Sequence, residues 1–223
     1  MVRTKLDNQL KKEALKYLGI PYWKNRITDG KITREGFLGG KGNWKQIQAE
    51  TQKLLGKFPQ KNTPDKVYNL QKKNRVGIDC SGLAYNLLDF LCQKIKQERL
   101  DNHITGVGGK NGIRRVSANI LTSEKNAIKI NNYENIKPGD LIRLDNGRHV
   151  IVILEKTGKT INYIHNSSKT YDRGVHLGSI TLINPNQPLN YQQWSDILKD
   201  KGNYALLFNH KNGDGIFRLK CLS

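Results

Sequence analysis

The stretch Gly-Ile-Asp-Cys-Ser-Gly at residues 77–82 is followed directly by apolar residues at helical spacing. This pattern predicts a helix over residues 79–97 with a broad apolar face, and Asp79 can cap its free backbone amides. The apolar positions of this face are Leu83, Leu87, Leu88, Leu91 and Ile95. Cys80 would stand in the first turn, where unpaired amides and the positive end of the helix dipole lower the pKa of a thiol. Such a thiol is a candidate nucleophile, and the alternative is a buried core thiol, the commoner role of cysteine.

Downstream of this helix the pattern changes to short β-like runs separated by turn residues. Strands are expected at residues 141–144, 148–155, 160–165, 176–183 and 216–222. Helices followed by a meander of strands predict an α+β domain in which helices pack on a central antiparallel sheet. One late helix is expected over residues 191–199, where Trp194, Ile197 and Leu198 would pack together.

Two histidines border the strands of an expected hairpin. His149 opens one strand and His165 closes the next, an even number of positions later. If the turn is centred near Thr157, the two imidazoles lie opposite each other on one face of the sheet. A thiol nucleophile needs a base, and the base needs an orienting partner. His149 would therefore take the proton of Cys80, and His165 would hold the ring of His149. The remaining histidines, His103, His176 and His210, are expected to be structural or on the surface.

The N-terminal third contains an amphipathic helix and then a stretch of different composition. Leu6, Leu10, Ala14 and Leu18 predict a helix over residues 4–18 that stops at Gly19. Residues 24–75 are rich in Lys, Gln, Asn and Gly, which indicates a lobe inserted into a single domain of residues 1–223. Within the lobe we expect two helices, one capped by Asn43 and ending before Gly56, and a short one starting at Thr63-Pro64.

Composition excludes several classes of protein. The chain has 223 residues, with 38 Lys plus Arg against 19 Asp plus Glu and a formal net charge of +19. Its three cysteines can form neither a disulfide framework nor a paired zinc motif. The longest aliphatic run, residues 150–154, is far below the roughly 20 residues of a membrane span. The charge draws polyanions such as nucleic acid, anionic lipid or an acidic bacterial wall, although a merely solubilising surface would look the same.

Five short stretches in this order resemble the NlpC type of papain-like cell-wall cysteine peptidases. They are Ala-Leu-Lys-Tyr-Leu-Gly-Ile-Pro-Tyr at 14–22, Asp-Cys-Ser-Gly at 79–82, Arg-Val-Ser-Ala at 115–118, Ile-Lys-Pro-Gly-Asp-Leu at 136–141 and Tyr-Ile-His-Asn-Ser at 163–167. The resemblance implies a papain-like fold with the inserted lobe placed before the catalytic helix. Cys80 carries over as nucleophile, His149 as general base and His165 as the third polar residue.

The resemblance also implies a function. It points to a peptidase that cuts peptidoglycan stem peptides, often between D-glutamate and diaminopimelate, or to an amidase on related bonds. No metal or organic cofactor would be needed. Peptidoglycan is the implied partner, together with an inhibitor or immunity protein if the chain is an antibacterial toxin.

A tyrosine is expected to support the oxyanion beside the backbone amide of Cys80. Tyr22 matches the tyrosine of the family, but residues 24–75 separate it from the cysteine motif. Tyr68 lies closer to Cys80 in the sequence and is a rival for this role. Trp23-Lys24-Asn25 follows Tyr22 where the family commonly has Trp-Gly-Gly, so specificity could differ.

The N-terminus, Met-Val-Arg-Thr-Lys-Leu-Asp, lacks the apolar stretch and cleavage site of a secretory signal. We therefore expect the chain to start in the cytoplasm. It would reach a wall through lysis, through a dedicated secretion machine or through a leader already removed.

Two other readings compete with a wall peptidase. The same thiol and histidine would serve a papain-like acyl or amide hydrolase on another substrate. A basic nucleic-acid-binding protein, with Cys80 only in the core, would use Trp23, Trp44 and Tyr22 for stacking, although no recognised binding motif supports it.

Overall fold

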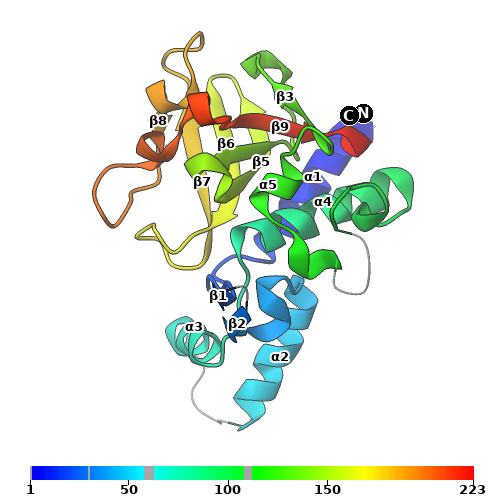
Figure 1. Cartoon of the computed structure of the whole chain (residues 1–223), viewed down its shortest axis with the longest axis vertical. Helices are drawn as coiled ribbons and strands as arrows, with labels where there is room; N and C mark the ends of the chain where they lie inside the picture. The colour runs from blue at the N-terminus through cyan, green and yellow to red at the C-terminus, as the bar shows by residue number, and fades with distance from the viewer. Residues whose placement is uncertain (1, 30, 58–62, 108–111) are drawn as a thin grey trace.

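A seven-stranded antiparallel sheet forms the centre of the structure, with the strand order β3-β9-β4-β5-β6-β7-β8 (Figure 1). The strands are β3 (Ala127–Ile130), β4 (Leu141–Leu144), β5 (His149–Thr157), β6 (Thr160–Asn166), β7 (Val175–Thr181), β8 (Gln193–Trp194) and β9 (Gly215–Leu219). This computed structural model describes residues 2–29, 31–57, 63–107 and 112–223. Its helices and antiparallel sheet confirm the predicted α+β class. The sequence patterns missed β3 and β8, which are short.

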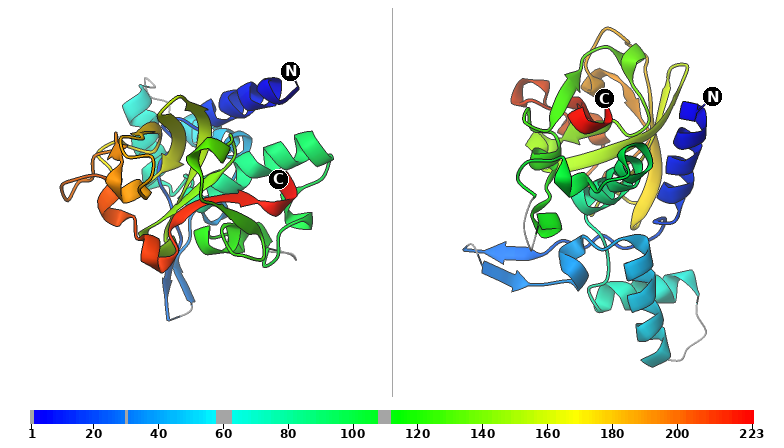
Figure 2. Two further views of the ribbon diagram at one scale, coloured as in Figure 1. Left: turned by 90° about the horizontal axis from the view of Figure 1, so that it is seen from above. Right: turned by 90° about the vertical axis from the view of Figure 1, so that its right-hand side faces the viewer.

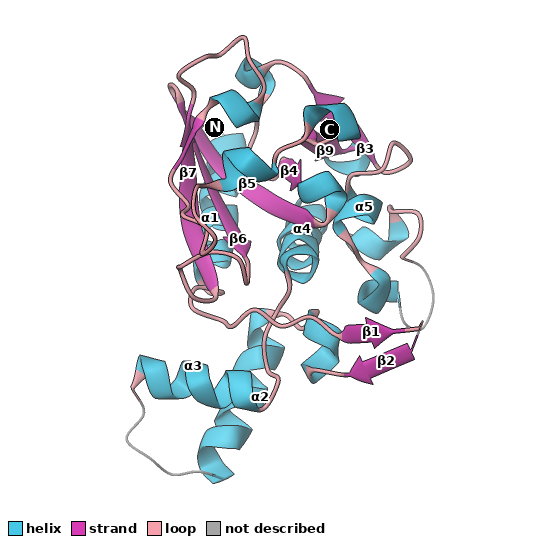
Figure 3. Cartoon of the chain, turned by 60° about the vertical axis from the view of Figure 1, so that its left-hand side comes forward, coloured by secondary structure: helices cyan, strands magenta, loops and turns pink. Residues whose placement is uncertain are grey.

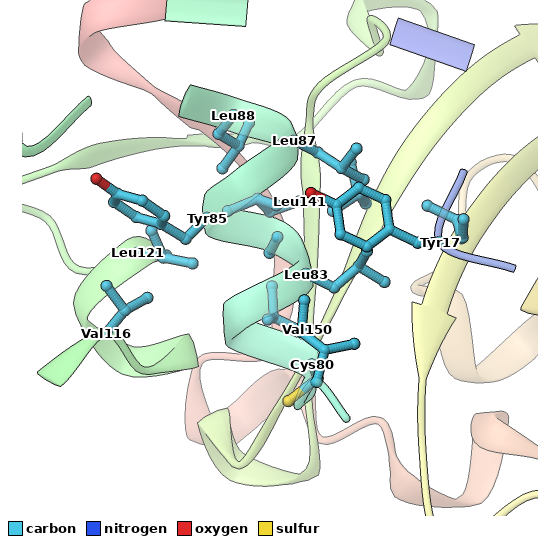
Figure 4. Packing of buried hydrophobic residues seen from close by; sticks show 14 of the residues in the cluster. Tyr17, Cys80, Leu83, Tyr85, Leu87, Leu88, Val116, Leu121, Leu141 and Val150 are labelled. Carbon is cyan, nitrogen blue, oxygen red and sulfur yellow. The ribbon is translucent and has the colours of Figure 1, made fainter. Parts of the chain in front are cut away.

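The helix that begins at Cys80 forms the middle of the core. This helix, α4 (Cys80–Lys96), packs against β5 and β6, and α1 (Val2–Leu15) lies beside it. Four residues of its predicted apolar face are buried, with Leu83, Leu87 and Leu88 fully enclosed, but the fifth, Ile95, is 50% exposed near the end of the helix. Figure 4 shows these side chains around α4, with Cys80 at the start of the helix and Val150 of β5 next to it. Burying a leucine side chain stabilises the fold by roughly 1.5–3 kcal/mol, so this face anchors the helix on the sheet.

The opposite face of the sheet has its own apolar cluster. Ile151, Ile153, Tyr163 and Trp194 belong to it, and the 3₁₀ turn Tyr204–Leu207 contributes Tyr204. The sheet is therefore covered on both faces, which explains why β5 is continuously apolar rather than alternating.

Two further helices, α5 (Ala118–Leu121) and α1, belong to this domain. The helix α5 is capped by the Ser117 hydroxyl, which accepts from the Ile120 amide. The first helix, α1, ends before the predicted Leu18, and Gly19 follows at φ +76°, a conformation that favours glycine. Within the described part of the chain, no helix combines the length and the apolar character needed to cross a membrane.

The described residues between 24 and 75 lie outside the sheet as a lobe, below it in the right-hand view of Figure 2 and in Figure 3. The lobe contains the hairpin β1 (Arg26–Thr28) and β2 (Lys31–Arg34), and the helices α2 (Trp44–Lys57) and α3 (Pro64–Lys73). Both predicted caps are present, because Asn43 accepts from the Gln46 amide and Thr63 from the Lys66 amide. Gly56 lies inside α2 rather than beyond its end.

The two ends of the lobe meet. The Ile78 amide donates to the Pro21 carbonyl at 3.0 Å, and the Trp23 amide donates to the Ile78 carbonyl at 3.2 Å. The segment before the lobe thus runs beside the segment after it, with a parallel bridge between Tyr22 and Ile78. Residues that the lobe separates in sequence are neighbours in space.

The predicted late helix over residues 191–199 is wrong. The 3₁₀ turn Leu189–Tyr191 leads into β8, and Ile197 then forms an isolated bridge with Asn203. The spacing of Trp194, Ile197 and Leu198 imitates one helical face, but Ile197 is 60% exposed while the other two are buried. Pairing of β8 with β7 satisfies the backbone that a helix would otherwise satisfy.

Candidate active site

Cys80 occupies the first turn of α4, as predicted. The Asp79 carboxylate caps the helix and accepts from the Gly82 amide at 2.7 Å. The backbone N–H of Val150, which follows His149 on β5, faces the Cys80 thiol. Cys80 is 7% exposed, so the thiol is sheltered but reachable.

The electrostatics of the thiol differ from the expectation. Burial and, to a lesser degree, the nearby Asp79 carboxylate raise the pKa of Cys80 to about 11, although Lys41 and the Val150 N–H act in the opposite direction. The effect of burial on the thiol pKa is therefore larger than the expected lowering by the helix N-terminus, and Cys80 is not a thiolate at neutral pH. The resting thiol is protonated and needs a base to become a nucleophile.

A buried lysine of the lobe neutralises the helix cap. Lys41 Nζ lies 2.7 Å from both carboxylate oxygens of Asp79 and 2.6 Å from Ser81 Oγ. The Asp79 amide in turn donates to the Gly40 carbonyl at 3.0 Å. Sequence reasoning missed Lys41, because nothing along the chain distinguishes it from the many surface lysines.

His149 and His165 form the predicted pair, with His149 Nε2 and His165 Nδ1 2.9 Å apart. They are not directly opposite, however, since Val152 pairs with Ile164 and one further step places His165 opposite Ile151. A β-bulge between Ile153 and Glu155 shifts the register of the hairpin by one residue. Without that shift, the two side chains would point to opposite faces of the sheet.

The surroundings of His149 keep it neutral and oriented. Burial lowers its pKa well below the ordinary value, and the neighbouring His165 lowers it further. The Tyr204 ring stacks on the imidazole, with centroids 5.4 Å apart and planes 5° from parallel. Because His165 engages Nε2, Nδ1 is the ring nitrogen left to act as a base toward the thiol.

A carboxylate beyond His165 extends the row of polar groups. Asp196 Oδ2 lies 3.1 Å from His165 Nε2, and Asp196 Oδ1 lies 3.1 Å from His176 Nε2. Tyr163 donates its hydroxyl hydrogen to the same carboxylate. Burial alone would raise the pKa of Asp196, but these partners hold it well below its usual range. Asp196 is thus an anion among the rings.

Sequence reasoning missed both Asp196 and the position of His176. Asp196 falls in the segment assigned to a helix, and no local motif marks it. His176 pairs with His165 across β6 and β7, so its ring is buried beside the candidate site rather than on the surface. His103 and His210 lie apart from this group, with His103 ion-paired to Glu98.

The two tyrosines differ in their position relative to Cys80. The Tyr22 hydroxyl lies close enough to Cys80 for the sulfur to raise its pKa, although burial is the larger cause. Tyr22 also lines a cavity of about 60 Å³ together with His149 and Tyr204. Tyr68 instead sits on α3, with its ring 5.1 Å from the Arg173 guanidinium. The meeting of the lobe ends brings Tyr22, and not Tyr68, to the thiol.

The cavity beside His149 carries positive side chains. Arg148 and Lys169 line it and are exposed, and the Asp145 carboxylate, which also lines it, lies 2.7 Å from Lys169 Nζ, so two positive side chains stand against one negative side chain. Ser167 and Ser168 complete the polar wall. The opening therefore suits a polar, negatively charged molecule better than an apolar one.

Taken together, these groups give a protonated buried thiol, a neutral histidine base and a second histidine held near a carboxylate. No protein-family model, curated protein or solved structure matches this chain.

Proposed function

We propose that the chain is a papain-like cysteine peptidase or amidase that hydrolyses amide bonds in peptidoglycan stem peptides. The observation that carries this proposal is the histidine pair, 2.9 Å apart, on strands next to the buried Cys80. Cys80 opens the central helix, His149 opens a strand and His165 closes the next, as the resemblance to NlpC-type peptidases leads one to expect. The bond between D-glutamate and diaminopimelate is the proposed target.

The reaction begins with proton transfer from the Cys80 thiol to His149 Nδ1. The resulting thiolate attacks the carbonyl carbon of the scissile amide, and its π electrons move to oxygen. The Cys80 amide and the Tyr22 hydroxyl donate to that oxyanion. Because burial raises the pKa of Tyr22, its hydroxyl keeps its proton and remains a donor. When the carbonyl re-forms, His149 gives its proton to the leaving amine, and a thioester remains.

Water completes the cycle. His149 removes a proton from a water molecule, which attacks the thioester and releases Cys80 as a thiol once the proton returns. His165 accepts from the Nε2–H of His149, so that Nδ1 of the base stays unprotonated and can take the proton of Cys80. Asp196 lies at the far side of His165 and favours a proton on His165 Nε2.

The charge of the opening supports an acidic substrate. Stem peptides carry free carboxylates, and Arg148 and Lys169 stand beside His149. The net charge of +19 would also hold the chain near an acidic wall polymer. These attractions are screened by salt, so binding to whole walls should weaken at high ionic strength.

Digestion of purified peptidoglycan tests the proposal. Walls of several chemotypes are treated with wild type, Cys80→Ala and the matched control Cys221→Ala, which removes a free cysteine far from the histidines. We expect wild type and Cys221→Ala to release the same peptides, and Cys80→Ala to release none. Mass spectrometry of the fragments names the bond.

Two results would refute the proposal. Equal digestion by Cys80→Ala would show that the thiol is not the nucleophile. No digestion of any wall by a folded wild type would exclude peptidoglycan as the substrate and point to an acyl or amide hydrolase on another molecule.

A further inference from the structure

Three polar side chains converge on one buried point beside the candidate active site. The proposed reaction does not require all three together. His165, His176 and Asp196 place one ligand atom each within 4.8 Å of one another. His165 and Asp196 are 0% and 2% exposed, and His176 is 11% exposed at its side chain. Both imidazoles direct Nε2 toward the same carboxylate at 3.1 Å.

The hydrogen bonds around this point leave part of the cluster unsatisfied. His165 Nε2 is fully buried, and although it is close to Asp196 it has no hydrogen-bond partner with suitable alignment. His176 Nδ1 lies 2.8 Å from the Gly174 carbonyl, which can only accept, so Nδ1 carries a proton. His176 Nε2 is hydrogen-bonded to Asp196 Oδ1 at 3.1 Å, so without a metal ion these two atoms share a proton. A metal ion at this point would give His165 Nε2 the partner that it lacks, because a metal ion needs a lone pair rather than an aligned N–H group.

The spacing also fits a metal ion. Zinc binds nitrogen and oxygen at about 2.0–2.1 Å, so neighbouring ligand atoms of a tetrahedral site are roughly 3.3 Å apart. The two separations of 3.1 Å are close to that value, with His165 next to Oδ2 and His176 next to Oδ1 of Asp196, and one ligand atom from each residue lies within 4.8 Å of the others. Two imidazoles and one carboxylate suit zinc and similar divalent transition metals, whereas magnesium and calcium prefer oxygen ligands.

We propose that His165, His176 and Asp196 form a binding site for a divalent transition metal of the zinc class. Each residue supplies one atom, Nε2 from either histidine and one carboxylate oxygen from Asp196. Binding releases to solvent the proton that His176 Nε2 otherwise shares with Asp196. The partly exposed edge of His176 is the route by which the ion enters.

Metal binding would switch off the proposed peptidase, and this consequence rests on the proposed function. A metal on His165 Nε2 forces the His165 proton onto Nδ1, which then donates to His149 Nε2. The proton of His149 must move to Nδ1, where it faces the thiol. The base then has no lone pair for the proton of Cys80, so the ion inhibits the enzyme through its proton positions without touching the sulfur.

Binding is measured on the full chain with Cys80→Ala, so that the catalytic thiol cannot hold the metal. Zn²⁺ is titrated by calorimetry and Co²⁺ by its visible absorption, with Mg²⁺ as the negative probe. We expect one ion per chain, and at least tenfold weaker binding after His176→Ala or Asp196→Asn. His210→Ala is the matched control, because it removes an exposed histidine away from the cluster. Equal affinity in His176→Ala and His210→Ala would overturn the site.

Nitrogen NMR of the histidines in the same Cys80→Ala protein reads the protons directly and does not require a variant of the cluster to fold. Zn²⁺ should move the proton of His165 from Nε2 to Nδ1 and that of His149 from Nε2 to Nδ1. A bound ion that leaves both rings as they were would overturn the switch.

Activity provides the last test, with each protein compared with its own metal-free rate. In a chain with Cys80 intact, His176→Ala should require at least tenfold more Zn²⁺ for half inhibition. The same inhibition curve in both proteins would refute the switch. The binding and NMR measurements use an inactive chain, so they stand or fall independently of whether peptidoglycan is the substrate.

Discussion

Lys41 Nζ lies 2.7 Å from both carboxylate oxygens of Asp79, and each of the two side chains is 5% exposed. The lobe thereby inserts a buried positive charge beside Asp79, the residue that caps α4. A buried pair adds little stability compared with an apolar pair, but removal of one partner leaves an isolated charge without water. The lobe is therefore part of the candidate active site and not an appendage.

Replacement of this lysine should destabilise the fold. Lys41→Met leaves the Asp79 carboxylate buried without its cation, and we expect the free energy of unfolding to fall by about 3–5 kcal/mol. Urea denaturation measures the change. Lys53→Met is the matched control, since the Lys53 side chain is 71% exposed, and it should change stability by less than about 0.5 kcal/mol. Equal midpoints for the two variants would contradict a structural role of the pair.

The reactivity of Cys80 should depend steeply on pH. Its pKa is raised to about 11, so the thiolate fraction grows about tenfold per pH unit below that value. Alkylation of Cys80 by iodoacetamide should follow the same slope from about pH 7 to about pH 10, as read by mass spectrometry of the Cys80 peptide. Lys41→Met removes a positive charge near the sulfur and should move the curve to higher pH. A rate that is already constant at pH 7 would instead indicate a preformed thiolate.

The two histidines should differ in their effect on turnover. His149→Ala removes the base, and we expect kcat on stem peptides to fall by about 10²–10⁴-fold. His165→Ala removes only the group that orients the base, so a smaller loss is expected, and His165→Asn should restore part of it through its amide oxygen. Similar losses for His149→Ala and His165→Ala, with no rescue by asparagine, would argue against these roles. His210→Ala is the control for the loss of a histidine.

The oxyanion role of Tyr22 separates it from Tyr68. Tyr22→Phe deletes one hydroxyl near Cys80 and should lower kcat by about 10²–10³-fold, the usual effect of losing one oxyanion donor. Tyr68→Phe deletes a hydroxyl on α3 and should leave kcat unchanged. Steady-state rates of the two variants on the same stem peptide decide the matter, and a larger loss for Tyr68→Phe would reverse the assignment.

Local sequence signals predicted that Cys80 opens a helix and that the two histidines lie together, because each of these placements depends on short-range structure. Asp79 and Cys80 mark the start of a helix whose apolar face is plain, and the hairpin places His149 near His165. The agreement is partly fortuitous for the histidines, since the expected turn was misplaced and a bulge restored the common face. A bulge of this kind has no strong sequence signature.

Long-range contacts could not be predicted in the same way. Lys41 reaches Asp79 only because the ends of the lobe meet, and Asp196 reaches His165 only because β8 pairs with β7. The apolar spacing near Trp194 favours a helix locally, and tertiary pairing overrides it. Residues whose roles depend on such pairing resemble ordinary surface residues in the sequence.

The backbone hydrogen bonds between Pro21, Trp23 and Ile78 hold the two ends of the lobe together, so the lobe can change in length during evolution. The entropic cost of closing a flexible loop rises slowly with its length, by about 0.6 kcal/mol for each doubling. The part up to Lys41 must keep its path, because its ammonium reaches the helix cap. Beyond that point, we expect that α3 can be shortened, extended or exchanged with little effect on the proposed reaction, so new substrate preferences can arise there while Cys80 and the two histidines keep their places.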